Sequence, residues 1–142
     1  MSVEYSDTGS VIAKGEYIEG FKEGEWVYTL GGTEEIGKYY EGEKEGTWRG
    51  KYIDNGKNYY EGNFLNGFKN GRFWYYYESG KIKRKESYVN GVKDGLWEYL
   101  DESGNVNFSI EFKEGKEIKY NGERISYGRR VDRELEEEEQ EN

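Results

Sequence analysis

The side chains of this chain that can do chemistry are mainly tyrosines, tryptophans and carboxylates. Its 142 residues include 15 Tyr, 4 Trp and 30 Asp or Glu, but no His and no Cys. The lack of His removes the commonest general base, and the lack of Cys removes thiol nucleophiles, thiolate metal sites and disulfides. No nucleophile–base pair or metal constellation stands out among the carboxylates. We therefore expect recognition by rings and negative charge, with no enzyme activity, no cofactor and no bound metal.

Four rings near the centre of the chain are the best candidates for such recognition. They lie in two runs, Tyr59-Tyr60 and residues 73–77 (Phe-Trp-Tyr-Tyr-Tyr), in which consecutive rings must point to both faces of a strand. Strands with rings on both faces are either buried on both sides or expose a patch that binds. Tyr and Trp also anchor interfaces more often than other residues. The candidates are Tyr59, Tyr60, Trp74 and Tyr76, with packing in the core or at an edge as the alternative.

A run of carboxylates closes the sequence. Residues 129–142 hold 3 Arg and 7 Asp or Glu, so 3 − 7 = −4 of the net charge of −9 lies there and −5 on the rest. We expect Asp132 to Gln140 to form a short acidic helix, with Asp132 as its N-cap. In it, Glu134 and Glu137 are candidate contacts to a basic partner, and a purely solubilising tail is the alternative.

The charge balance restricts the partner. Proteins that bind nucleic acid carry a basic stripe or patch, and acidic lipid heads also attract basic segments. The sequence shows no basic run of this kind, so we predict no nucleic-acid partner, and a membrane partner is disfavoured. A basic protein partner is favoured instead, through electrostatic steering. The first residues show neither the basic nor the apolar part of a signal peptide, so we expect a cytoplasmic protein.

A repeated pattern must position these groups. It reads Gly-x-Tyr-x-x-Gly-x-x-x-Gly-x-Trp-x-Tyr, and its copies start at residues 15, 37, 62, 86 and 110, in steps of 22, 25, 24 and 24 residues. The second copy has Gly50 where Tyr is expected, the fourth opens on Glu86, and the fifth has decayed. A fixed period of this length indicates a repeat architecture in which each unit buries its apolar face on its neighbours.

Each unit is predicted to hold two short strands. Alternation places Trp26 and Tyr28 on one face, where a ring opposite a glycine can lie flat against the backbone. These periodic rings form either the core of the sheet or an aromatic groove. We expect tight hairpin turns at Thr8-Gly9, Gly31-Gly32, Asn55-Gly56, Ser79-Gly80 and Ser103-Gly104. Glycine pairs four residues apart, such as Gly20 and Gly24, predict a second and slightly longer class of turn.

The predicted fold is all-β. It is an elongated, single-layer antiparallel meander of about ten short strands, followed by the short acidic C-terminal helix. Residues 1–12 are expected to form an N-terminal cap, 13–128 five repeats, and 129–142 the acidic tail. The degenerate fifth repeat is either a cap or an interface, because arrays need atypical terminal units to cover their last apolar face.

The repeat resembles the MORN repeat. The match is strongest over residues 71–83 (Gly-Arg-Phe-Trp-Tyr-Tyr-Tyr-Glu-Ser-Gly-Lys-Ile-Lys) and 88–99, and it covers about three quarters of the chain. The specific form is similar to the bacterial variant of the YwqK type, a family of toxin–antitoxin system antitoxins. The resemblance implies a protein-binding antitoxin or immunity protein that neutralises a basic, toxin-like partner by masking its surface. The alternatives are a structural scaffold that self-associates, as a homodimer for example, or sits near a membrane, and a carbohydrate-binding module.

Overall fold

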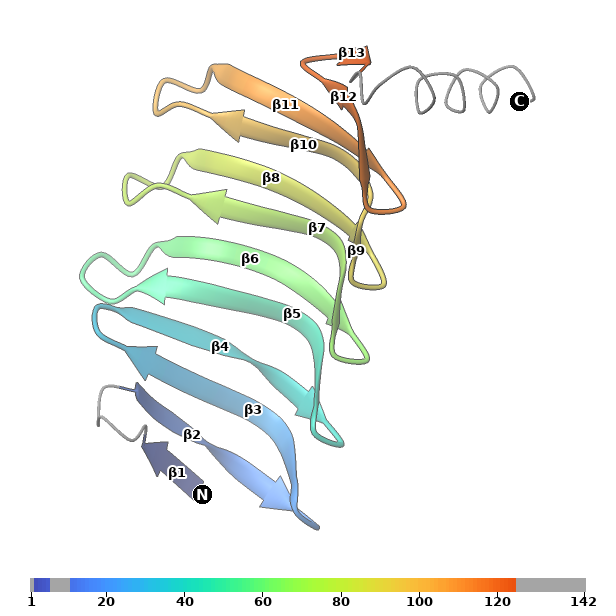
Figure 1. Ribbon diagram of the computed structural model, residues 1–142. Helices are drawn as coiled ribbons and strands as arrows, with labels where there is room; N and C mark the ends of the chain where they lie inside the picture. The colour runs from blue at the N-terminus through green and yellow to red at the C-terminus, as the bar shows by residue number, and fades with distance from the viewer. Residues whose placement is uncertain (1, 6–10, 125–142) are drawn as a thin grey trace.

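The chain forms one open, single-layer antiparallel sheet. The computed structural model describes residues 2–5 and 11–124, and Figure 1 shows the strands running back and forth in sequence order. Two-residue β9 pairs with β8 beside the main path, on which β10 follows β8. The strands are β1 (Ser2–Tyr5), β2 (Val11–Ile18), β3 (Phe21–Leu30), β4 (Thr33–Tyr40), β5 (Glu43–Tyr52), β6 (Asn58–Leu65), β7 (Phe68–Tyr76), β8 (Ile82–Val89), β9 (Val92–Lys93), β10 (Gly95–Leu100), β11 (Val106–Lys113), β12 (Lys116–Tyr120) and β13 (Glu123–Arg124).

This architecture confirms the predicted all-β antiparallel meander. Within residues 2–5 and 11–124 there is no helix, and so none long and apolar enough to cross a membrane. The acidic helix predicted from Asp132 to Gln140 lies outside the described residues.

The turns reverse the predicted assignment of the two turn classes. Glu19-Gly20 joins β2 to β3 as a two-residue turn with φ of 51° and 84°. Positive φ at both positions is type I′ geometry, whose twist matches that of the flanking strands. The same geometry recurs at Glu41-Gly42, Asn66-Gly67 and Asn90-Gly91. Of the predicted tight turns, Gly31-Gly32 is confirmed and Thr8-Gly9 lies outside the described residues. The other three connections are longer and span residues 53–57, 77–81 and 101–105.

The second glycine of each four-step pair bends a strand instead of making a turn. Three residues of β3, including Gly24, stand opposite a single residue of β2 between the pairs Lys14–Val27 and Glu16–Glu23. Such a bulge bends the strand and increases its twist. Figure 1 shows these bends near the tight turns. The bulge glycines all have positive φ: 68° for Gly24, 74° for Gly46, 87° for Gly71 and 92° for Gly95.

The core lies on one face of this bent sheet, which we call the inner face. Trp26 and Trp48 are 0% exposed and Phe73 is 1% exposed, so this face covers its own rings without a second layer. Each ring lies flat over a glycine of the preceding strand, as expected for a ring opposite a residue that lacks a Cβ. A Cβ added to that glycine would lie 2.2 Å from Trp26 at Gly15, 1.9 Å from Trp48 at Gly37 and 2.1 Å from Phe73 at Gly62.

Backbone carbonyls fix the orientation of the indoles. Trp26 Nε1 donates to the carbonyl of Glu16 at 3.1 Å, and Trp48 Nε1 donates to that of Lys38 at 3.1 Å. Trp97 makes the equivalent bond to Ser87 at 3.0 Å. A buried indole N–H is therefore satisfied in each unit that has a tryptophan at this position, as buried polar groups require.

A continuous file of aromatic rings joins the units. Successive centroids are 4.9 to 6.1 Å apart, and most contacts are edge-to-face. Such pairs contribute about 0.5–1.5 kcal/mol each beyond the burial of their area. We call this file the ring ladder; its members are Tyr17, Trp26, Tyr39, Trp48, Phe64, Phe73, Tyr88, Trp97 and Phe112.

Replacing Gly37 by alanine tests the ring-over-glycine contact. The new methyl group would overlap the ring of Trp48, so Gly37→Ala is expected to lower the free energy of unfolding by about 3 kcal/mol or more. Denaturant unfolding measures the change. Gly32→Ala is the matched control, because a Cβ at Gly32 meets nothing within 4 Å. Equal effects of the two substitutions would show that the ring does not rest on Gly37.

Candidate interaction surfaces

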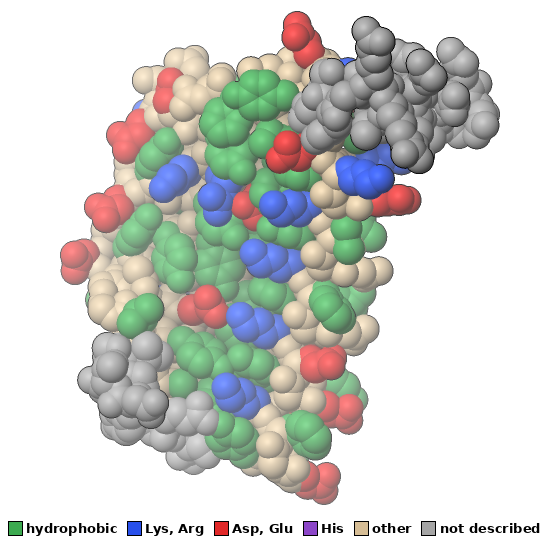
Figure 2. All heavy atoms as spheres, viewed as in Figure 1, with side chains coloured by type: hydrophobic (Ala, Val, Ile, Leu, Met, Phe, Trp, Pro, Cys, Tyr) green, Lys and Arg blue, Asp and Glu red, His purple; other side chains and the backbone are tan. Residues whose placement is uncertain are grey.

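The inner face carries a row of lysines that covers the ring ladder. Lys22, Lys44, Lys69 and Lys93 each stand opposite a ring of the ladder, across a tight turn. Each Nζ lies 4.4 to 5.3 Å from the centroids of two or three rings. Figure 2 shows this face, with basic side chains in a column among hydrophobic ones. We call these four residues the lysine column.

The bulge glycines place the lysines over the rings. Lys22 precedes Gly24, and the bend there folds the start of β3 back toward the ring of Trp26. The apolar stem of a lysine can then cover the ring while its ammonium group stays at the surface. Cation–π contacts of this kind contribute about 0.5–1 kcal/mol at exposed sites.

Polar partners hold part of the lysine column in place. Lys22 donates to the hydroxyl of Tyr28 at 2.8 Å, and Lys44 pairs with Glu35 at 3.3 Å. The Tyr28 hydroxyl in turn lies 2.7 Å from that of Tyr39. Burial and this hydrogen bond raise the pKa of Tyr39, so its hydroxyl stays neutral well above the usual titration range of tyrosine. Lys22 is therefore held by uncharged hydroxyl groups, and Lys44 is held by the carboxylate of Glu35.

A carboxylate replaces the glycine in the fourth unit. Glu86 stands opposite Phe73 and is only 6% exposed. Its Oε2 lies 2.7 Å from Arg84 Nε, as an ion pair without the alignment of a hydrogen bond. Its Oε1 accepts a hydrogen bond from the hydroxyl of Tyr88 at 2.7 Å. Burial, that bond and the charge of Glu86 raise the pKa of Tyr88, which keeps the phenol protonated as the donor.

The outer face carries a second surface. It lies beside the type I′ turns, which are Glu19-Gly20, Glu41-Gly42, Asn66-Gly67 and Asn90-Gly91. The residues just before and after each turn pair across the strands, as Ile18 does with Phe21 and Leu65 with Phe68. Their side chains point away from the ring ladder, because they alternate with its members. Seven of them are apolar and 40 to 63% exposed. We call this row the turn-side stripe; it consists of Ile18, Phe21, Tyr40, Leu65, Phe68, Val89 and Val92.

Contacts between successive turns fix the positions of the stripe residues, although between the second and third turns the contact is made by Glu43, which packs on Gly67. Phe21 packs on Gly42 of the next turn and Phe68 on Gly91, with ring carbons 3.0 and 2.9 Å from where a Cβ would lie. The backbone N–H of each turn glycine donates to the preceding unit, for example Gly42 to the carbonyl of Lys22 at 3.0 Å. Each turn is therefore docked on its neighbour, which fixes the spacing of the apolar side chains.

Glutamates surround the first half of the stripe. Residues 16–25 and 38–45 contain the turns Glu19-Gly20 and Glu41-Gly42. Within these two ranges, Lys38 is the exposed basic side chain of the outer face. The exposed acidic side chains there, which we call the acidic rim, are Glu16, Glu19, Glu25, Glu41 and Glu43.

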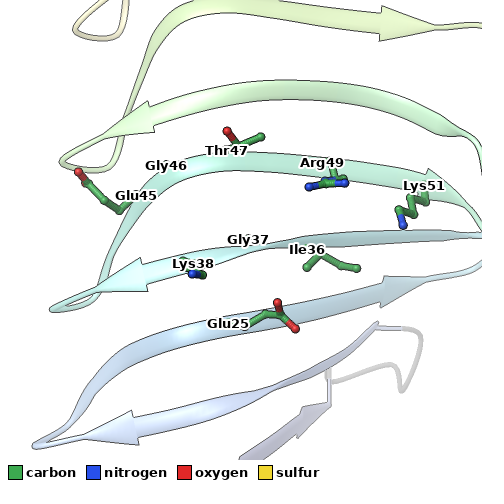
Figure 3. A pocket seen from close by; sticks show the side chains of 9 residues that line it. All are labelled: Glu25, Ile36, Gly37, Lys38, Glu45, Gly46, Thr47, Arg49 and Lys51. Atoms are coloured by element: carbon green, nitrogen blue, oxygen red, sulfur yellow. The ribbon is translucent and has the colours of Figure 1, made fainter.

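The outer face also has a shallow hollow of about 510 Å³ across β3, β4 and β5. Figure 3 views it from the side opposite to Figure 1. The side chains around it include Glu25 and Glu45 but also Lys38, Arg49 and Lys51, so their charges largely balance. No group of three Asp or Glu among the described residues is placed to hold a metal ion.

The structure divides the four predicted rings between the two faces. Tyr60 is 7% exposed within the core, and Tyr59 is half-buried with its ring over Gly50. Tyr59 thus fills the place of the tyrosine that the second repeat lacks. Trp74 and Tyr76 are half-buried on the outer face, where the Nζ of Lys85 lies 5.4 Å from the ring of Trp74.

The remaining predicted contacts, Glu134 and Glu137, lie outside the described residues. Sequence reasoning missed both the lysine column and the turn-side stripe. Both carry a repeated signal: a lysine five residues after the ring in four units, and apolar residues on either side of an x-Gly dipeptide.

Comparisons with known proteins do not place the chain in a family. No family model matches it, and no curated protein matches it. A crystal structure of a mutant of S. aureus TarM, in complex with fondaparinux, alpha-GlcNAc-glycerol and UDP, superposes with a TM-score of 0.34 at 9% identity. The match covers 82% of this chain and 20% of that chain, so this chain spans about a fifth of its length.

Removing the charge of Glu86 tests its ion pair with Arg84. Glu86→Gln neutralises a carboxylate whose side chain is 5% exposed and leaves Arg84, whose side chain is 34% exposed, without its counter-ion. We expect a loss of about 1.5 kcal/mol of folding stability, below the cost of breaking a fully buried pair because solvent screens the charge of Arg84. Chemical unfolding measures the loss. Glu98→Gln is the control, because Glu98 pairs with Lys85 at 3.8 Å and both side chains are about a third exposed; we expect a change below about 0.5 kcal/mol there. A Glu86→Gln variant as stable as the control would contradict the assignment.

Proposed function

We propose that this protein is a non-enzymatic binding module that recognises a basic protein through its turn-side stripe and acidic rim. The observation that carries the proposal is the row of seven apolar side chains, each 40 to 63% exposed, along one side of the sheet. Single exposed apolar residues are normal, but a contiguous row bordered by charges is typical of an interaction surface.

The stripe has the anatomy of a protein interface. Phe21, Tyr40 and Phe68 offer rings, which are enriched among the residues that dominate binding energy. The hydrogen bonds between turns hold these side chains in a fixed row, so that little ordering of the backbone is required on binding. Apolar contacts supply affinity, and the surrounding glutamates exclude acidic partners.

The charge of the partner follows from the acidic rim and from the net charge of −9. Rim charges mainly raise the rate of encounter and select partners of opposite charge. A basic protein is therefore attracted to the side of the sheet where the stripe lies.

The biological role that fits is that of an antitoxin or immunity protein. The resemblance of the repeat to the MORN type supports this role, and an extended row is suited to masking the surface of a toxin-like partner. The second candidate is a scaffold that self-associates, because the sheet of the described residues is open and ends at β1 and β13, and the edge strand of an open sheet can pair with another chain. Edge pairing buries little charge, so it should not weaken as salt rises.

Substitution of the stripe tests the proposal. Phe21→Ser combined with Phe68→Ser is expected to reduce capture of a basic protein from lysate of the source cells at least tenfold, because it removes two ring anchors worth about 2 kcal/mol each. Capture is quantified by mass spectrometry at low and high salt, and binding of the wild-type protein should weaken as salt rises.

Leu30→Ser combined with Val106→Ser is the matched control, because these residues are 54% and 49% exposed at the opposite ends of their strands. The control pair should leave thermal unfolding nearly unchanged, since surface substitutions alter stability by about 0.5 kcal/mol or less. The Phe21 and Phe68 pair also loses its packing on Gly42 and Gly91, so we expect it to lose about 1 kcal/mol, and capture is compared at a temperature at which thermal unfolding shows both variants folded. Equal capture by the two double variants would rule out the stripe as the interface. Recovery of the protein itself alone, unaffected by salt, would favour the scaffold.

A further inference from the structure

We infer that the lysine column of the inner face binds a linear acidic polysaccharide that carries one anionic group on every second sugar ring. This inference concerns the face opposite the turn-side stripe and does not depend on the proposed function. It rests on the spacing of the lysines, on the lack of a carboxylate partner at Lys69 and Lys93 among the described residues, and on the rings between them.

The spacing of the column is set by the repeat. Each unit contributes two strands, and neighbouring strands lie about 4.8 Å apart, so successive ammonium groups are spaced by about 10 Å. Two linked pyranose rings span a similar length. A chain lying along the column, across the strands, therefore passes the four lysine positions at the spacing of its anionic groups, and it can bring one such group to each of Lys69 and Lys93.

Two of the lysines have ammonium groups without a carboxylate partner. Among the described residues, Lys69 and Lys93 have no Asp or Glu oxygen within 4 Å, and Lys93 is exposed. Lys69 makes only a long contact of 3.5 Å to the Tyr75 hydroxyl. The rings beneath them supply electrostatic attraction but accept no strong hydrogen bond. An anion can therefore take up the remaining N–H groups.

Rings between the lysines can contact the sugars. Tyr17 is 41% exposed, and Tyr39 and Tyr88 are half-buried, so each presents part of its ring on the inner face. Such rings combine an apolar body with a polar tip. That combination suits a sugar, which has apolar C–H faces and hydroxyl edges. Ring and lysine positions alternate along the column, with the ring between Lys44 and Lys69, Phe64, only 8% exposed.

The same features disfavour the two other common polyanions. A nucleic-acid strand carries a charge about every 3.4 Å, roughly three charges for each lysine, and the net charge of −9 repels so dense a polymer. A membrane surface attracts clusters of about 4–8 Lys or Arg that face a flat plane. The column instead lies on the inner face of a sheet whose strands bend near the tight turns (Figure 1).

The column has a defined end. In the fifth unit Glu117, not a lysine, stands opposite Phe112. The chain therefore offers four lysine positions, which correspond to a polysaccharide segment of about eight sugar rings at the spacing above.

Binding of a hyaluronan octasaccharide, which has a carboxylate on alternate rings, to the full-length protein tests the inference. Tryptophan fluorescence and calorimetry should report saturable binding that weakens with salt. Lys69→Met with Lys93→Met keeps the apolar stems over the rings but removes two charges. We expect this variant to bind at least about tenfold more weakly, because two charge-assisted hydrogen bonds are lost.

The controls separate a site from general attraction. Lys38→Met with Lys113→Met removes two exposed charges elsewhere and should leave binding unchanged, as should the Phe21→Ser and Phe68→Ser variant. Thermal unfolding of all variants checks that they fold. The inference is overturned if neutral chitin octasaccharide binds as tightly, if the Lys38 and Lys113 variant loses as much affinity, or if single-stranded DNA or vesicles of anionic lipid bind more tightly than hyaluronan.

Discussion

The stacking of an aromatic ring on a glycine of the preceding strand is the contact on which this structure depends. Only a residue without a Cβ lets Trp48 lie flat on the backbone of β4. Burying a ring of about 200 Å² contributes roughly 5 kcal/mol, as an upper value because the unfolded chain already shields part of it. A single-layer sheet has no second layer to supply such burial, so these contacts, repeated along the chain, replace the core of a globular domain.

The same contact divides the molecule into two surfaces. Covering a ring such as Trp26 requires the strand to bend, and the bend occurs at a glycine with positive φ, Gly24. On the inner face the bend brings Lys22 over the ring. On the outer face it leaves Ile18 and Phe21 exposed beside the turn. The strand bend at this glycine therefore produces both the lysine column and the turn-side stripe, and each is repeated at the period of the sequence.

Periodicity was enough to predict the strands, the meander and the ring over glycine, because each of these is a local consequence of alternation. The turn classes were assigned wrongly except at Gly31-Gly32, because each four-step glycine pair was interpreted as one longer turn. Its first glycine instead closes a type I′ turn, as in Asn66-Gly67, and its second bends the strand. The lysine column required knowledge of the bend, which a linear pattern does not contain. Tyr59 moves to the inner face because the register shifts beside Gly50, a tertiary effect that no spacing rule anticipates.

The most direct test of the account is acrylamide quenching of tryptophan fluorescence in the Trp74→Phe variant. This variant retains Trp26, Trp48 and Trp97, which are 0, 0 and 3% exposed, so their emission should resist quenching by a neutral solute until the protein unfolds. Quenching of the folded variant as strong as that of free tryptophan would contradict the claim that a single-layer sheet encloses its own core.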